Sequence, residues 1–324
     1  MPKAMRVYEY GGPEVMRYED VATVEPGPGQ VRVRQTAIGV NFIDIYFRSG
    51  AYKAAALPFT PGKEGAGTIA ALGAGVTGFK IGDRVAYAAG EGTYAEELIV
   101  PVGAIVHVPD AIDDVTAAAM MLKGLTAEYL LHRTYTVKAG DTILFHAAAG
   151  GVGLIACQWA KHLGATVIGT VGSPEKAELA RANGCDHVIL YRDEDFAKRV
   201  REITDGKGVP VVYDGVGKDT FPASLDCISP LGLFVSFGSA SGPIPPFDIS
   251  LLNTKGCLYA TRPSLFVHAG NRATLDAMAE NLFSVMASGA VKIPVHAQAK
   301  LADAQQVHRD LAGRQTTGAT VMIP

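Results

Sequence analysis

A glycine-rich turn between a short apolar run and a helical pattern is the stretch of this chain best suited to binding a phosphate. The apolar run covers residues 142–145, and small residues follow it as Ala148-Ala-Gly-Gly-Val-Gly153. Gly150 and Gly151 let the backbone approach a pyrophosphate, and the N-terminus of the following helix attracts anions. Gly153 lets the helix pack close to the strand. The usual Gly-x-Gly-x-x-Gly fingerprint starts here with alanine, so the strand–turn–helix context carries the prediction of a dinucleotide site.

The end of the next predicted strand indicates which nicotinamide cofactor is preferred. An NAD site places an acidic residue there, about 20 residues past the glycines, to hold the ribose hydroxyls. Here the strand ends as Ile168-Gly-Thr-Val-Gly-Ser173 without a carboxylate at its tip, and Lys176 follows. A hydroxyl and an ammonium suit a 2′-phosphate, which an aspartate would repel. We therefore predict NADPH, with Tyr191-Arg192 against the adenine, although a solvated helix lysine is the alternative interpretation of Lys176.

The elements that position these residues follow from the pattern of the whole chain. Residues 1–110 carry short apolar runs between Gly and Pro turns, which predicts a β-rich, partly closed barrel. A helical pattern runs from Asp113 to Leu130, and Gly124 within it marks a predicted break between two helices. Residues 142–260 then alternate strand and helix, which predicts a doubly wound parallel sheet. The predicted strands are Thr142–Phe145, Thr166–Val171, His187–Leu190, 209–213, 231–237 and 256–260. The predicted helices between them start near Val152, Pro174, Asp195 and Thr220. In the rest of the chain we predict a helix over 272–289, a strand from 293, a helix over 301–311 and a strand over 318–323.

Composition excludes several classes of protein. The chain has 324 residues, of which 48% are hydrophobic and 19% charged, so it can bury a large core across about two domains. A net charge of −3 argues against a nucleic-acid or membrane-surface role that depends on bulk charge. We see no signal peptide in residues 1–12 and no apolar run that would span a bilayer, so we expect a cytoplasmic protein. The four cysteines, Cys157, Cys185, Cys227 and Cys257, are widely spaced and fit buried free thiols better than a zinc site or disulfides.

Taken together, the motifs resemble the zinc-independent, zeta-crystallin-like quinone oxidoreductase branch of the medium-chain dehydrogenase/reductase superfamily. The motifs that carry the resemblance are Ala37-Ile-Gly-Val-Asn-Phe-Ile-Asp44, Arg48-Ser-Gly-Ala-Tyr52, Pro61-Gly-Lys-Glu-Gly-Ala-Gly67, Gly82-Asp-Arg-Val85, Lys123-Gly-Leu-Thr126, His146-Ala-Ala-Ala-Gly-Gly-Val-Gly153 and Thr261-Arg-Pro-Ser264. The resemblance covers essentially the whole chain. It implies a GroES-like substrate domain over residues 1–124, a Rossmann NADPH-binding domain over 125–265, a C-terminal return to the substrate domain over 266–324, and a homodimer.

Zinc-dependent members of that superfamily carry a cysteine in the first motif and Gly-His-Glu in the third. This chain has Asn41 in the first, and Lys63 before Glu64 in the third. Neither a cationic lysine nor an amide is a usual zinc ligand, so we predict no metal in the site. His146 stands alone before the glycine turn and reads as structural.

The resemblance also implies which residues meet the substrate and the cofactor. Asn41 and Tyr46 would face the nicotinamide, with Tyr52 at the rim, and an amide and a phenol can hydrogen-bond an acceptor oxygen that gains negative charge. Thr126 and Tyr129, expected at the start of the linking helix, would contact the nicotinamide half, whereas Asp44 reads as structural. Arg314 resembles a family cofactor contact, and a surface arginine is the alternative. The predicted cofactor contacts in full are Asn41, Thr126, Tyr129, Gly150, Gly151, Val152, Gly172, Ser173, Lys176, Tyr191, Phe237, Gly238, Ser239, Arg262 and Arg314.

The predicted reaction is hydride transfer from NADPH to a quinone. No residue stands out as an obligatory general acid, and water can supply the protons of a quinone's product oxygens. An alkenal or enoyl reductase on the same scaffold remains the alternative, and it would more often need a placed donor, for which Tyr46 or Tyr52 is the candidate. A non-enzymatic binder is the third class. RNA binding is disfavoured, because the chain is acidic and lacks a basic stripe.

Overall fold

The structure, a computed structural model, describes residues 1–88 and 91–324 and divides the chain into two compact units. The first unit contains Met1–Leu125, Ala269–Glu280 and Ile293–Pro324, and the second contains Thr126–His268 and Asn281–Lys292. The second unit therefore includes residues 281–292, which lie within the segment that we assigned to the C-terminal return. The domain boundaries at 124/125 and 265/266 stay predictions.

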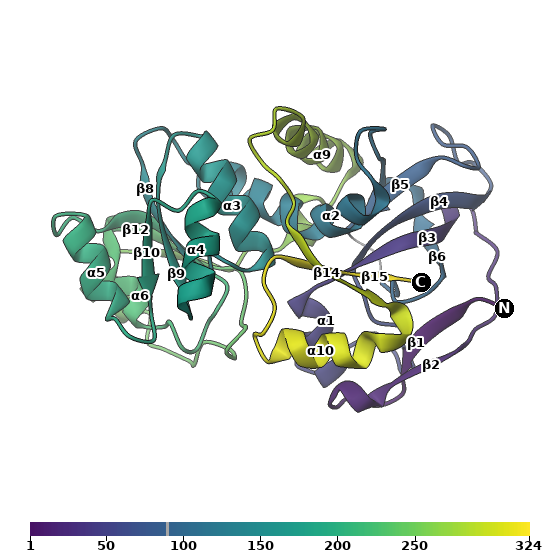
Figure 1. The fold of residues 1–324 in the computed structure, drawn as a ribbon, viewed down its shortest axis with the longest axis horizontal. Helices are drawn as coiled ribbons and strands as arrows, with labels where there is room; N and C mark the ends of the chain where they lie inside the picture. Colours follow the sequence, from purple (N-terminus) through teal and green to yellow (C-terminus); the bar gives the residue numbers. More distant parts are fainter. Residues whose placement is uncertain (89–90) are drawn as a thin grey trace. The chain divides into compact units, whose positions relative to one another are not determined.

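The second unit, drawn mostly in teal and green in Figure 1, is built on a six-stranded parallel sheet in the order β10-β9-β8-β11-β12-β13. Numbered along the chain from β8, this order is 3-2-1-4-5-6, the doubly wound order of dinucleotide-binding domains. The strands are β8 (Thr142–His146), β9 (Thr166–Val171), β10 (His187–Leu190), β11 (Val209–Asp214), β12 (Ile228–Ser236) and β13 (Tyr259–Thr261). The helices are α3 (Gly151–His162), α4 (Pro174–Ala182), α5 (Phe196–Ile203), α6 (Ala223–Asp226), α7 (Ser250–Thr254) and α8 (Leu265–His268). The predicted Rossmann fold is confirmed.

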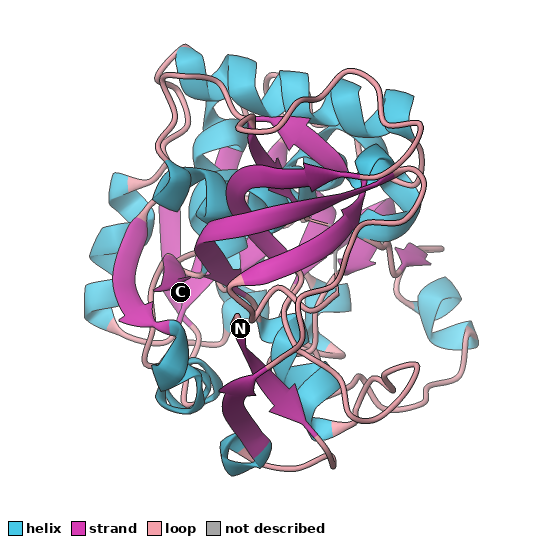
Figure 2. Cartoon of the chain, turned by 90° about the vertical axis from the view of Figure 1, so that its right-hand side faces the viewer, coloured by secondary structure: helices cyan, strands magenta, loops and turns pink. Residues whose placement is uncertain are grey.

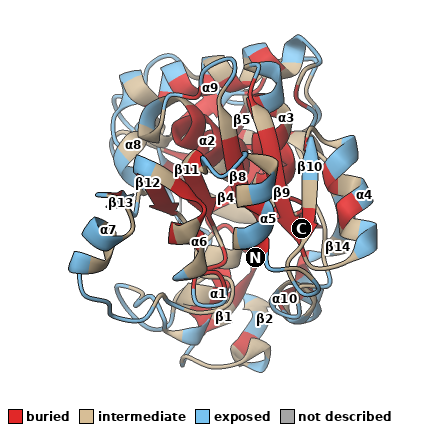
Figure 3. Ribbon diagram, turned by 90° about the vertical axis from the view of Figure 1, so that its left-hand side faces the viewer, coloured by how far each residue is buried: buried red, intermediate tan, exposed pale blue. Residues whose placement is uncertain are grey.

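The central strands of this sheet are apolar because helices cover them. Leu144, Ile168, Val212 and Phe234 come from four different strands and pack in one buried core. Figure 3 shows the strands largely buried and the helices with both buried and exposed residues. A strand that is buried on both faces needs a near-continuous apolar run, and this is why the sequence predicted these strands well.

The first unit is a mostly antiparallel β-structure that the two ends of the chain build together (Figure 2). Its seven-stranded sheet has the order β14-β15-β3-β4-β5-β7, and β6 also pairs with β3. The strands are β3 (Gln30–Val40), β4 (Glu64–Leu72), β5 (Arg84–Tyr87), β6 (Glu97–Pro101), β7 (Ile105–His107), β14 (Val295–Lys300) and β15 (Ala319–Ile323). A separate hairpin joins β1 (Lys3–Val7) to β2 (Met16–Asp20), and α1 (Phe42–Ser49) and α10 (Ala304–Ala312) complete the unit. The predicted GroES-like β-rich fold is confirmed.

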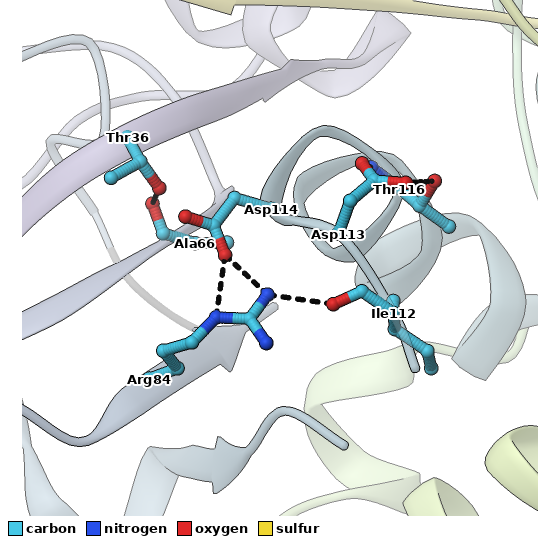
Figure 4. A network of polar contacts seen from close by, with 7 residues as sticks. All are labelled: Thr36, Ala66, Arg84, Ile112, Asp113, Asp114 and Thr116. Atoms are coloured by element: carbon cyan, nitrogen blue, oxygen red, sulfur yellow. Dashed lines mark hydrogen bonds and ion pairs between the residues drawn. The ribbon is translucent and has the colours of Figure 1, made fainter. Parts of the chain in front are cut away.

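Polar contacts fix β5 of this sheet against the start of α2 (Asp114–Tyr129), as Figure 4 shows. The Arg84 guanidinium on β5 donates to Asp114 Oδ1 at 3.0 and 2.5 Å and to the carbonyl of Ile112 at 2.6 Å. Asp113 caps the helix by accepting from the backbone N–H of Thr116 at 2.9 Å. The start of α2 therefore has a fixed position relative to the sheet.

Two expectations about α2 are wrong. The helix continues through Gly124 without a break, and a five-residue π-helix, Leu130–Thr134, follows it. Glycine costs about 1 kcal/mol in a helix interior, and the helix absorbs this cost because the residues around Gly124 are buried. Thr126 and Tyr129 consequently lie in the last turn of α2 and not at the start of a helix. A second long helix, α9 (Arg272–Ala287), lies where we predicted one.

No helix among the described residues combines the length and apolar character needed to cross a membrane.

Candidate functional site

The glycine turn occupies the end of β8 and the start of α3. Gly150 is the N-cap of α3 with extended backbone, and Gly151 and Val152 form its first turn, so the first N–H groups of the helix lack helical partners. A Cβ on Gly153 would lie 2.4 Å from the carbonyl oxygen of Ala147 and 2.7 Å from that of Ala148. The turn therefore requires glycine there, and a turn this close to the helix suits a pyrophosphate.

The other nucleotide contacts predicted within the sheet follow the ends of its strands. Gly172 and Ser173 come directly after β9, Tyr191 after β10, Phe237 to Ser239 after β12, and Arg262 after β13. Because the carboxyl ends of parallel strands meet at one edge of a sheet, these residues share the edge that carries the glycine turn. Ligands of such sheets bind at this edge. The residues present therefore fit a dinucleotide.

The first turn of α4 is the predicted 2′-phosphate site. Ser173 is the N-cap of α4, and its hydroxyl oxygen accepts from the backbone N–H of Lys176 at 3.4 Å. A hydrogen bond from the Ser173 side chain also lowers the pKa of the exposed Glu175 carboxyl. The sequence analysis overlooked Glu175, a carboxylate four residues past the end of β9 and two past Ser173. A phosphate that uses the Ser173 hydroxyl has to compete with this carboxylate.

The Arg262 guanidinium organises the loop after β12. It donates to Ser236 Oγ at 2.9 Å, to the carbonyl oxygen of Gly238 at 3.3 Å and to Ser239 Oγ at 3.1 Å. Phe237 packs against Phe145 of β8, with ring centroids 5.5 Å apart. The structure thus brings together four of the predicted contacts, Phe237, Gly238, Ser239 and Arg262.

Tyr129, predicted to contact the nicotinamide half, is almost fully buried, with 3% of its surface exposed. Its ring stacks on His268 with centroids 4.7 Å apart and planes 5° apart. Burial raises the pKa of Tyr129, and the hydrogen bond with Thr126 and the charge of Arg262 oppose this rise. Thr126, Tyr129 and Arg262 are therefore neighbours within the second unit. The sequence analysis missed His268, which no motif marks.

In the first unit, the residues predicted to meet the acceptor gather around α1. Asn41 is the N-cap of this helix, and Tyr46 and Tyr52 pack edge to face with ring centroids 5.2 Å apart. Phe47 contacts the Tyr52 ring at 5.8 Å, and Lys63 Nζ lies 4.2 Å from the centroid of the Phe47 ring. Lys63 also pairs with Glu91 at 2.8 Å. The structure thus joins the two tyrosines in one aromatic cluster that a cation flanks.

A buried chain of hydrogen bonds connects α1 to Tyr94 and His308. Arg48 lies 3.2 Å from His308 Nδ1, His308 Nε2 lies 2.9 Å from Tyr94 Oη, and Tyr94 donates to Asp44 Oδ2 at 3.0 Å. Arginine has only donors, so His308 Nδ1 accepts, Nε2 carries the proton, and every bond in the chain points toward Asp44. Asp44 Oδ2 also accepts from the backbone N–H of Asn41 at 2.8 Å.

Burial sets the protonation of this chain. It raises the pKa of Asp44 to about 7, even though the hydrogen bonds from Asn41 and Tyr94 favour the carboxylate. Burial and the neighbouring Arg48 charge lower the pKa of His308 to about 3. His308 is therefore neutral at pH 7, and Asp44 titrates near it. The interpretation of Asp44 as structural stays a prediction, although its contacts are those of a residue that fixes the start of α1.

The side chain of Asn41 is fixed as well. Its Nδ2 donates to Glu64 Oε1 at 2.8 Å, and the same oxygen accepts from Lys123 Nζ at 2.5 Å. Glu64 and Lys123 belong to two motifs that carried the family resemblance, but the sequence gave no sign that they meet at Asn41. Arg314 lies in the turn after α10, in the same unit as Asn41, with a left-handed backbone at φ 56°.

The described residues contain no group of three or more His, Cys, Asp or Glu side chains arranged to hold a metal ion. Lys63 pairs with Glu91, and Asn41 donates to Glu64. Absence of zinc from the reaction remains a prediction.

Comparisons with known proteins define the class first. Residues 27–110 match the family model of the alcohol dehydrogenase GroES-like domain, and residues 151–283 match that of the zinc-binding dehydrogenases. This pairing places the chain in the medium-chain dehydrogenase/reductase superfamily.

Full-length relatives then define the family. A quinone oxidoreductase of Pseudomonas aeruginosa is 54% identical over 100% of both chains, and a 2-haloacrylate reductase of Burkholderia is 45% identical over 100% of this chain and 99% of the relative. A quinone oxidoreductase of Escherichia coli, solved in complex with NADPH, superimposes with a TM-score of 0.97 at 46% identity, over 99% of this chain and 100% of the other. The chain belongs to the quinone oxidoreductase family, which confirms the predicted resemblance.

Proposed function

We propose that this protein is an NADPH:quinone oxidoreductase that transfers hydride to quinones without zinc. The observation that carries the proposal is the 54% identity, over the whole chain, to a quinone oxidoreductase. The carboxyl edge of the parallel sheet supports it, because this edge collects the glycine turn, Ser173 and Lys176 without an acidic residue at the tip of β9.

NADPH, when bound, supplies the hydride. Asn41 and Tyr46 bind and orient the acceptor, and their N–H and O–H groups stabilise the negative charge that grows on its oxygen. Tyr52 packs against Tyr46 and keeps water from that side of the acceptor, and 38% of its own surface is exposed. Removal of one such donor costs about 10²–10³ in kcat in enzymes that rely on oxyanion stabilisation.

The same residues support a second candidate, reduction of an α,β-unsaturated carbonyl. The observation in its favour is the 45% identity to a 2-haloacrylate reductase. This reaction adds a proton to carbon, for which Tyr46 or Tyr52 would be the donor. The two candidates differ in substrate but not in cofactor.

A substrate panel tests the proposal. We expect steady NADPH oxidation with 1,2-naphthoquinone and a much lower kcat/KM with 2-chloroacrylate and alkenals, because the chain groups with quinone oxidoreductases. The paired variant Asn41→Ala/Tyr46→Phe should lose about 10²-fold or more in kcat with the quinone. Unchanged quinone reduction by this variant would remove the two residues from the site, and activity with 2-chloroacrylate alone would favour the second candidate. Elemental analysis of the active protein should find no stoichiometric zinc.

The proposed working form is a cytoplasmic homodimer. Among the described residues β13 pairs only with β12, and Tyr259 on it exposes 62% of its surface, so the strand offers an edge to a second copy. A Pro in place of Ala260 would remove one backbone N–H from this three-residue strand and so weaken its ability to pair. We expect sedimentation velocity to give a dimer for the wild type and a monomer for Ala260→Pro. The free cysteines, one of which is exposed, fit a reducing compartment.

A further inference from the structure

Glu64 is a fully buried carboxylate at the first residue of β4. It accepts three hydrogen bonds: from Asn41 Nδ2 at 2.8 Å, from Lys123 Nζ at 2.5 Å and from the backbone N–H of Leu122 at 2.6 Å. The first two share Oε1 and the third uses Oε2. A buried carboxylate is stable only with such partners, and Lys123, itself 5% exposed, balances its charge.

This arrangement decides which way the Asn41 amide points. An ionised carboxylate has no proton to donate, so the NH₂ group of Asn41 has to face Glu64 and its oxygen has to face elsewhere. One N–H of Asn41 is then used by Glu64, and its oxygen faces the start of α1 as the capping-box acceptor for the Asp44 backbone, so the amide keeps one N–H donor for another partner. A neutral side chain such as Gln offers both a donor and an acceptor, so it would accept the amide in either orientation.

A glycine on the neighbouring strand makes room for the carboxylate. A Cβ on Gly39 of β3 would lie 2.4 Å from Glu64 Oε1, 2.5 Å from Glu64 Cγ and 2.2 Å from the carbonyl oxygen of Ala118. Three segments, β3, β4 and α2, therefore converge on the side chain of one residue.

We propose that Glu64 and Lys123 are positioning residues for the reaction, which select one orientation of the Asn41 amide and thereby set its remaining N–H toward the acceptor oxygen. The proposal rests on the function proposed above. It adds a requirement to that function: Asn41 acts only while the charged pair beneath it is intact.

The test is a double-mutant cycle on kcat with 1,2-naphthoquinone. Glu64→Gln/Lys123→Met replaces the pair by neutral side chains of similar size and leaves no buried charge without a partner. We expect this variant to lose about tenfold in kcat, because a misoriented donor costs that much or more, with the NADPH Kd within about twofold of wild type by calorimetry. In an Asn41→Ala background the same double substitution should change kcat by less than about twofold.

A matched control removes an ion pair from the opposite end of the same helix. Arg84→Met/Asp114→Asn breaks the contact of β5 with the start of α2 (Figure 4). It should keep kcat within about twofold of wild type, because neither residue touches Asn41. An equal loss of kcat from the Glu64/Lys123 double substitution in both backgrounds, or an Asn41→Ala variant with wild-type kcat, would overturn the proposal while quinone reduction itself stands.

A second measurement does not depend on turnover. With ¹⁵N-labelled asparagine, the Asn41 side-chain amide resonance is identified by its absence in Asn41→Ala. In the protein without cofactor we expect the hydrogen of this amide that faces Glu64 to exchange with solvent at least about tenfold faster in Glu64→Gln/Lys123→Met than in wild type, since a charge-assisted bond is lost. Equal exchange in the two proteins would contradict the orientation argument even if no quinone were a substrate.

Discussion

The two units hold their functional residues in opposite ways. In the second unit, most of the predicted nucleotide contacts are turn positions that follow strands of the parallel sheet, so we expect the backbone to do most of the positioning. In the first unit, Asn41 depends on Glu64 and Lys123, 23 and 82 residues further along the chain, and on Asp44, which is linked to His308. A phosphate can be bound by the free main-chain N–H groups at a helix N-terminus. A side-chain amide, in contrast, is held in one orientation only by hydrogen bonds from other side chains. We therefore expect substitutions in the second unit to change cofactor binding, and substitutions in the first unit to change the side-chain network and its stability.

The largest expected effect lies in the glycine turn. Gly153→Ala puts a Cβ 2.4 Å from the carbonyl of Ala147, so the turn or the helix has to move. We expect NADPH affinity measured by calorimetry to fall roughly a hundredfold, which is about 2.7 kcal/mol. The control is Gly103→Ala, where a Cβ meets open space, and it should bind NADPH as the wild type does. Wild-type affinity in Gly153→Ala would mean that backbone geometry does not limit this half of the site.

An intermediate effect is expected at the start of α4. Ser173→Asp places a carboxylate where we predict the 2′-phosphate, and the ratio of kcat/KM for NADPH to that for NADH should fall by about 10–100-fold. Glu175→Gln should move the ratio the other way by a few-fold, because it removes an exposed charge that competes for the Ser173 hydroxyl. Equal ratios in Ser173→Asp and wild type would contradict the phosphate assignment.

The last prediction concerns stability and not activity or binding, and it belongs to the side-chain network of the first unit. The pKa of Asp44 is raised from 3.8 to about 7, so between these values the folded protein holds a proton that the unfolded chain has lost. The free energy of unfolding therefore falls as pH rises through this window, by at most about 1.4 kcal/mol per pH unit, and levels off above it. Asp44→Asn cannot titrate at this position, so its free energy of unfolding should not show this fall. Measured by urea unfolding at pH 5 and pH 7.5, the stability of the variant relative to wild type should be higher at pH 7.5.

Asp113→Asn is the control for that measurement. The helix N–H groups lower the pKa of Asp113, so its contribution to stability is present above pH 4 and disappears only below it. Its difference from wild type should be the same at pH 5 and pH 7.5. A constant difference for Asp44→Asn as well would show that Asp44 is ionised throughout this range.

The contrast between the units also explains what the sequence could predict. β9 and β10 lie within the bounds that we expected, because a buried parallel strand is a continuous apolar run between turn residues. The predicted helix break at Gly124 was wrong, because local propensity favours a break where tertiary burial keeps the helix continuous. The partners of Asn41 were beyond prediction for another reason. Nothing in the spacing of Glu64, Lys123 and His308 says that their side chains meet, since only the folded sheet and helices bring them to one place.

The pairing of β3 with β15 has a consequence for synthesis of the protein. Ile38, Gly39 and Val40 pair with Met322, Val321 and Thr320, near the last residue of the chain. While the ribosome is still adding residues, this edge of β3 has no neighbour, and the buried Arg48 has no His308 to bind. Most of the nucleotide unit, in contrast, is one continuous segment from Thr126 to His268, which emerges before the tail of the chain. The nucleotide unit can therefore begin to form before β15 is made, whereas β3 can complete its pairing only after β15 has been synthesised.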